Sequence, residues 1–486
     1  MALCPSHERA KDWKTAGAVV LDKDSIGSGV ELLRNKEFDD VAVILNKYDG
    51  IDLPDDTCRI LVLDSRPFSE ILTDRYEESC RASSDITTMK LTRTVEQGLG
   101  RAVRGEKDYC VVLIVGPSLV KFIRGKKTRA FLSVQTNTQI QIGLDIADLA
   151  KEDIEKGSTA LDVLQKLISQ CLARDEGWKE YYVAEMDKVG SYKAPSGELD
   201  LFAMESEAEQ HFNSGRIPSA IKTVQELIDR HCSENEDRGW YLQVMARYEF
   251  SRSKHESNAL QVAAHQKNHF VLRPREGMQI EKLSMISQRR VENIRTWLNR
   301  YQDLETRRIA LQEILANFRF GVRAEAFERA VNDLGIALGF QCQRPDKEWR
   351  EGPDNLWALR DNEFLLIECK SEVGLDRNQI NKDETGQMNN ACAWFARNYT
   401  GAKVTNWLII PTNVGTKASG FNEKVEILRE SGVKRIAGNA QAFFKELFRL
   451  DSSDLLDEKV MKLLKYHTLG VEELVSEYAV EPKFAS

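Results

Sequence analysis

Long hydrophobic runs are missing from this sequence of 486 residues. No stretch reaches the roughly 18 consecutive apolar residues that a membrane-spanning helix requires, so we expect neither such a helix nor a membrane partner. The first residues, MALCPSHERAKDW, are charged almost from the start and contain no apolar signal-peptide core. We therefore expect a cytoplasmic protein.

Paired cysteines are missing too. The nine cysteines are scattered and never form a CxxC pair. A zinc module or disulfide scaffold is therefore not expected, and reduced thiols are the simplest interpretation. The 11 prolines and 29 glycines are too few for a collagen-like or linker-dominated chain.

An excess of positive charge is also absent. The chain has 68 Lys and Arg against 76 Asp and Glu, a formal net charge of −8. A histone-like polybasic protein is excluded, whereas a local basic surface on an acidic chain is not. Hydrophobic residues make up 42% of the chain, enough for several packed cores. The length corresponds to roughly three domains.

The pattern of apolar residues predicts an α/β protein with a helical middle region. Short runs rich in Val, Ile and Leu, typical of parallel strands buried on both faces, occur at 16–21, 40–46, 58–64 and 109–116. Helical spacing dominates the middle of the chain, and strand signals then return. We expect an α/β lobe at 1–150, a helical domain at 151–308, a second α/β core at 309–450 and a helical tail at 451–486.

The N-terminal lobe contains the stretch EQGLGRAVRGEKDYCVVLIVG, in which Arg101 and Arg104 are three residues apart. On a helix this spacing places both guanidinium groups on one face, where they suit a phosphate at a domain boundary. The motif QxxGRxxR, with Gln97 and Gly100, resembles the last motif of superfamily-two helicases. The segment NKYDGIDLP resembles the preceding motif. By this resemblance Gly50 and Asp52 approach the nucleotide, in a RecA-like second helicase lobe.

The phosphate-cradling motif GxxxxGK[ST] of the first helicase lobe is missing, and GKKT at 125–128 lacks the upstream glycine spacing. We therefore expect no ATP hydrolysis by this chain alone. ATP would be bound only in complex with a separate Walker-A-containing helicase subunit, or the chain is a fragment of a longer product.

The strongest chemical signal is GPDNLWALRDNEFLLIECKSE at 352–372. Glu368 and Lys370 are two apart on an apolar strand and share one face, and Asp354 precedes the neighbouring strand. Two carboxylates with a backbone carbonyl, for which Cys369 is a candidate, suit Mg²⁺ or Mn²⁺. A lysine beside them can orient water and stabilise charge on phosphorus. A plain exposed strand with alternating charge is disfavoured, because a carboxylate within FLLIEC is costly to bury alone.

These residues resemble the PD-(D/E)xK nuclease superfamily, with Asp354, Glu368 and Lys370 at its three motif positions. The resemblance implies an α-β-β-β-α-β core. It also implies a metal-linked glutamate on the helix at 324–340, where Glu328 is preferred over Glu325. On the later helix, at 386–399, Gln387 would contact metal-bound water or phosphate.

Two functions remain open. The first is a metal-dependent deoxyribonuclease subunit joined to a helicase lobe, in prokaryotic restriction, anti-phage defence or repair. The second is a non-catalytic DNA-binding or regulatory subunit that completes the ATPase of a partner through Arg101 and Arg104. An intact set of Asp354, Glu368 and Lys370 favours the first.

Overall fold

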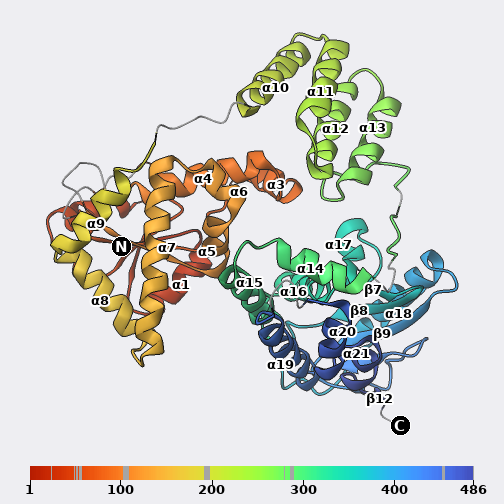
Figure 1. Cartoon of the computed structure of the whole chain (residues 1–486). Coiled ribbons are helices and arrows are strands. Elements are labelled where there is room, and N and C mark those ends of the chain that lie inside the picture. The colour runs from red at the N-terminus through yellow and green to blue at the C-terminus, as the bar shows by residue number, and fades with distance from the viewer. Residues whose placement is uncertain are drawn as a thin grey trace. The chain divides into compact units, whose positions relative to one another are not determined.

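The computed structural model describes residues 1–484 except for 23, 49, 51–52, 54–56, 70, 102–108, 191–196, 279, 285–288 and 451–454. The chain forms two compact units, Met1–Gly277 and Met278–Ser486, and Figure 1 labels most of their helices. No helix among the described residues is long and apolar enough to cross a membrane.

The first unit is built around a parallel sheet with the strand order β2-β3-β1-β4-β5. Its strands are β1 (Ala2–Cys4), β2 (Val19–Leu21), β3 (Ala42–Leu45), β4 (Ile60–Asp64) and β5 (Val111–Val115). Each predicted apolar run therefore contains a strand. We did not predict β1, which lies at the centre of the sheet, because three residues are too short to show a period.

Helices accompany this sheet and continue after it. They are α1 (His7–Thr15), α2 (Ile26–Arg34), α3 (Leu72–Cys80), α4 (Asp85–Leu99), α5 (Pro117–Arg124), α6 (Lys126–Phe131), α7 (Val134–Glu155), α8 (Ala160–Leu172) and α9 (Glu176–Met186). The Ser84 hydroxyl begins α4 by accepting a hydrogen bond from the N–H of Ile86 at 3.3 Å. The helix ends at Leu99, with Gly100 at its C-cap.

A helical module follows, which we define as α10 (Gly197–Asn213), α11 (Ile217–His231), α12 (Asn235–Glu249) and α13 (Lys254–Lys267). Buried apolar residues, among them Val224, Leu227 and Met245, form its core. This module belongs to the same unit as the sheet.

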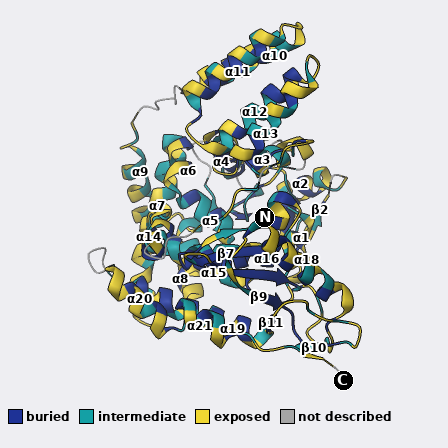
Figure 2. Cartoon of the chain, turned by 90° about the vertical axis from the view of Figure 1, so that its right-hand side faces the viewer, coloured by how far each residue is buried: buried dark blue, intermediate teal, exposed yellow. Residues whose placement is uncertain are grey.

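The second unit contains a mixed sheet with the order β11-β9-β8-β7-β6. Its strands are β6 (Gln341–Gln343), β7 (Asn355–Arg360), β8 (Glu363–Cys369), β9 (Lys403–Ile409) and β11 (Glu426–Leu428). Neighbouring strands are antiparallel from β6 to β8 and parallel from β8 to β11. All residues of β8 are buried, and the buried colour of β7 and β9 is visible in Figure 2.

Helices pack around this second sheet. They are α14 (Arg290–Asn299), α15 (Leu304–Asn317), α16 (Ala324–Ala337), α17 (Pro345–Trp349), α18 (Lys382–Asn398), α19 (Glu430–Leu447), α20 (Asp457–Tyr466) and α21 (Val471–Glu477). A small parallel pair is formed by β10 (Val414–Gly415) and β12 (Lys483–Phe484). Residues of α14 and of the tail, such as Trp297 and Leu464, are part of the same core as the sheet. The predicted helical domain at 151–308 is thus divided between the two units.

Candidate active site

Two neighbouring strands of the second unit bring the predicted acidic residues together. Asn355 of β7 pairs with Ile367 of β8 in antiparallel register, so Asp354 lies opposite Glu368. The Oδ2 atom of Asp354 accepts a hydrogen bond from the backbone N–H of Cys369 at 2.7 Å. This bond fixes one carboxylate at the end of β8, beside the other.

Glu368 is almost completely buried, with 6% of its surface exposed. Burial raises its pKa well above the ordinary value for a glutamate, and the nearby charge of Asp354 raises it further. Lys370 lies on the same face, with its Nζ atom 3.7 Å from Oε2 of Glu368. The site therefore has two adjacent carboxylates that a cation would stabilise.

Cys369 contributes in a different way. Its side chain is buried, and burial raises the pKa of its thiol well above the ordinary value. The thiol therefore suits neither a nucleophile nor a thiolate ligand, since both require the deprotonated form. Only its backbone carbonyl remains as the predicted metal ligand.

Glu328 of α16 lies near these carboxylates but already has a partner. Burial raises its pKa, and the charge of Asp354 adds to the increase. Its Oε2 atom accepts a hydrogen bond from Nη2 of Arg344 at 2.6 Å. Glu325, the second candidate on this helix, pairs with the same arginine at 3.1 Å and with Lys347 at 3.0 Å. Sequence reasoning did not identify this arginine.

Four of the predicted catalytic residues of the second unit share a cleft of about 510 Å³. Asp354, Glu368, Lys370 and Gln387 all line it, so the structure brings together four residues that are up to 33 positions apart in the sequence. Sequence reasoning missed the other charged or amide side chains of this cleft, which are Asp346, Arg350, Glu351, Asn390 and Arg397. The spacing of Gln387, Asn390 and Arg397 along one face of α18 could have revealed two of them.

The donor set fits a hard divalent cation. No cluster of three or more His, Cys, Asp and Glu side chains suited to a metal occurs in the described part of the chain. The two carboxylates and the Cys369 carbonyl nevertheless offer only oxygen atoms, the ligands that Mg²⁺ and Mn²⁺ prefer, and these ions commonly keep several waters.

The predicted nucleotide-binding residues of the first unit are only partly described. Asp52 and Arg104 lie outside the described residues. Gln97 lies on α4, and Gly50 has a positive φ of 75°. Arg101 follows the end of α4 at Leu99 and the C-cap Gly100, and the shared face predicted for Arg101 and Arg104 stays a prediction.

Arg101 nevertheless connects the two predicted motifs. Its Nε donates to the backbone oxygen of Gln97 at 2.8 Å. Its own backbone oxygen accepts the N–H of Leu53 at 3.2 Å. The residue after the C-cap of α4 is therefore bonded to Leu53, which is close in sequence to Gly50.

Residues 39–132 match a family model described as the helicase C-terminal domain. The matched stretch runs from just before β3 to just after α6 and includes Gly50, Gln97 and Arg101. The match therefore covers strands β3, β4 and β5 of the parallel sheet and indicates a helicase-related function on DNA. No curated protein matches this chain.

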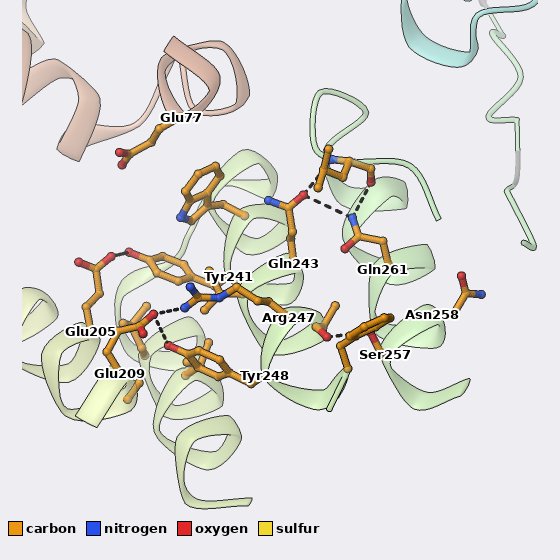
Figure 3. Close-up of a pocket in the computed structure, with 18 of the residues that line it drawn as sticks. Glu77, Glu205, Glu209, Tyr241, Gln243, Arg247, Tyr248, Ser257, Asn258 and Gln261 are labelled. Atoms are coloured by element: carbon orange, nitrogen blue, oxygen red, sulfur yellow. Dashed lines mark hydrogen bonds and ion pairs between the residues drawn. The ribbon is translucent and has the colours of Figure 1, made fainter. Parts of the chain in front are cut away.

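A larger pocket, of about 720 Å³, lies mainly in the helical module (Figure 3). Its acidic groups already have partners: Glu209 pairs with Arg247 and accepts from the Tyr248 hydroxyl at 2.8 Å, and Glu205 accepts from the Tyr241 hydroxyl at 2.6 Å. The smaller cleft is the better candidate for chemistry, because adjacent carboxylates and a lysine converge there.

Proposed function

We propose that the second unit is a metal-dependent deoxyribonuclease of the PD-(D/E)xK type, coupled to the helicase C-terminal domain of the first unit. The observation that carries this proposal is the shared cleft of Asp354, Glu368, Lys370 and Gln387. The surrounding elements support it, since α16, β6, β7, β8, α18 and β9 follow one another in the order helix, three strands, helix, strand, with the short α17 inserted.

In this proposal Asp354, Glu368 and the Cys369 carbonyl hold Mg²⁺ or Mn²⁺. A divalent cation held there supplies Lewis-acid polarisation of the phosphodiester and activation of water. The protein contributes the burial of Glu368, which strengthens its attraction for a cation, and the hydrogen bond that fixes Asp354.

Lys370 and Gln387 act on the substrate side. The Lys370 ammonium group, close to Glu368, orients the attacking water and stabilises the negative charge that develops on the phosphoryl oxygens. The Gln387 amide faces the same cleft and can bind water or phosphate. Glu328 is assigned a supporting role, because its bond to Arg344 limits its freedom to act as a ligand.

The helicase C-terminal domain implies a partner. We propose that Gly50, Asp52, Gln97, Arg101 and Arg104 complete an ATP site together with a Walker-A-containing helicase subunit. DNA moved or sensed by this motor would be cut by the nuclease, as suits prokaryotic restriction, anti-phage defence or repair.

The test compares cleavage of DNA by the full chain and by Lys370→Ala in the presence of Mg²⁺. We expect the variant to lose activity by a factor on the order of 10²–10³, because a preorganised charge in the transition state is removed. Lys417→Ala, which changes an exposed turn lysine, is the matched control and should keep full activity. Undiminished cutting by Lys370→Ala would remove this site from the mechanism.

Metal binding gives a readout that does not depend on activity. At a concentration of one hundred times Kd, Mg²⁺ should stabilise the folded chain by about 2.7 kcal/mol, and Glu368→Gln should lose most of this effect. If the wild-type chain binds DNA but neither binds metal nor cuts, the non-catalytic function is correct instead.

A further inference from the structure

Two arginines line the candidate cleft without any ion pair among the described residues. Arg350 and Arg397 are both exposed and share the cleft with Asp354, Glu368 and Lys370. The cleft also contains Glu351, yet no ion pair joins this carboxylate to either guanidinium group within the described chain. The positive charges of Arg350 and Arg397 are therefore available to a ligand.

We propose that Arg350 and Arg397 form a subsite for the backbone phosphates of DNA that flank the phosphate to be cut. This inference rests on the proposed nuclease function and adds residues for binding of the substrate. A guanidinium group stays charged and binds phosphate oxygens through two parallel hydrogen bonds, so it suits this ligand better than a neutral one.

Arg397 is placed for this role by the helix that also carries Gln387. The cleft-lining residues of α18 are Gln387, Asn390, Ala391, Trp394 and Arg397, which recur at helical spacing on one face. Gln387 and Arg397 are ten positions apart, which corresponds to about 15 Å along a helix. In duplex DNA that distance covers about four nucleotides of one strand. In this proposal Arg397 therefore binds a phosphate other than the one that is cut.

Arg350 comes from another wall of the cleft. It caps the end of α17 with a positive φ of 53°, a left-handed conformation that is uncommon for residues other than glycine. Its neighbour Trp349 is fully buried. Nearby Gly352 packs so closely on α18 that an added Cβ would lie 2.7 Å from Cδ2 of Trp394. The loop is therefore held firmly against α18, and Arg350 is kept in a conformation that glycine would adopt more easily.

The experiment uses the full chain with two substrates. One is a labelled 20-base-pair DNA duplex, and the other is bis(p-nitrophenyl) phosphate, which has a single phosphodiester and no flanking phosphate. The variants are Arg350→Gly, which suits the left-handed backbone, and Arg397→Ala. Arg308→Ala on α15 is the matched control, because this exposed arginine lies outside the cleft.

We expect each variant to raise KM for the duplex about ten- to one-hundred-fold, with little change in kcat. The dependence of duplex binding on salt should weaken by about one phosphate contact for each arginine removed. Hydrolysis of bis(p-nitrophenyl) phosphate should not change in either variant. Arg308→Ala should keep the KM, the kcat and the salt dependence of the wild-type chain.

Unchanged KM and salt dependence in both variants would overturn the subsite. An equal loss on both substrates would also overturn it, because the arginines would then act on the reacting phosphate or on the fold. Failure of the proposed function looks different: the wild-type chain would cut neither substrate. In that case duplex affinity, measured by fluorescence anisotropy without metal, still decides whether these arginines bind phosphate.

Discussion

Charge inside the second unit is compensated residue by residue, and Glu363 at the start of β8 shows how. Only 5% of this residue is exposed. It forms ion pairs with Arg360 and with Nζ of Lys403, the latter at 2.7 Å. Burial alone would raise the pKa of Glu363, but its bonds to these two cations lower it below the ordinary value. These two ion pairs therefore stabilise the fold only while the Glu363 carboxylate is ionised.

This gives a prediction for pH. Because the pKa is lower in the folded state, the unfolded state binds more protons at acidic pH, and the stabilisation is present above the ordinary pKa of about 4.5. It is lost as the pH falls through the folded-state value. We expect Glu363→Gln to cost about 1–2 kcal/mol at pH 7, since both cations are partly solvated, and to flatten this acid dependence. Urea unfolding from pH 3 to 7 measures the free energy of unfolding of both chains. Glu430→Gln, which changes a more exposed glutamate, is the control. Parallel curves for Glu363→Gln and wild type would contradict it.

At the scale of elements, α3 and the residue directly after it contact the helical module within the first unit. Arg81, directly after α3, is 1% exposed, and its Nε lies 2.7 Å from Oδ1 of Asp237 on α12. The Tyr76 hydroxyl donates to Oε1 of Gln243 at 2.7 Å. The Asn268 amide donates to the Cys80 backbone oxygen at 2.6 Å. Most of these bonds involve buried polar groups, so they are costly to break.

We expect Arg81→Ala to destabilise this attachment by about 3 kcal/mol, because it leaves Asp237 without its buried partner. Hydrogen exchange should then become faster in α3 and α12, while the sheet keeps its protection. Arg93→Ala is the control, since its half-exposed pair with Glu96 should be worth less than about 1 kcal/mol. Equal exchange in Arg81→Ala and wild type would show that other contacts hold the module.

At the scale of the whole molecule, the chain combines a helicase C-terminal domain with a candidate nuclease cleft in a separate compact unit. Its sequence has no GxxxxGK[ST] motif. The two functions should therefore be separable by mutation, because no residue of one site is a residue of the other.

We expect the pure chain to show no ATP turnover at any DNA concentration. A Walker-A-containing partner should bind it more tightly with an ATP analogue than without, and Arg101→Ala with Arg104→Ala should remove this difference. Each charge-assisted bond to phosphate is worth roughly 1.5–3 kcal/mol. Calorimetric titration measures the affinity for the partner with and without the ATP analogue. Nuclease activity of the double mutant is the control. ATP turnover by the pure chain, or equal affinities with and without nucleotide, would count against this ATP-site assignment.

The sequence alone determined the local features. Apolar runs located four strands of the first sheet, and the ExK spacing placed Glu368 and Lys370 on one face, because side-chain direction in a strand repeats every two residues. Each of the two helicase motifs was recognisable by itself, since the residues within one motif lie within about ten positions of one another.

Only the tertiary structure decided what depends on distant pairing. The β7–β8 register brought Asp354 beside Glu368, and the packing of α16 placed Arg344 within hydrogen-bond distance of Glu328. The fold also brought Arg350 and Arg397 into the same cleft. Strand register and packing depend on contacts between residues far apart in the chain, which no local period encodes. The end of α4 at Leu99 is likewise seen only in the structure, because Gly98 lies inside the same helix without ending it.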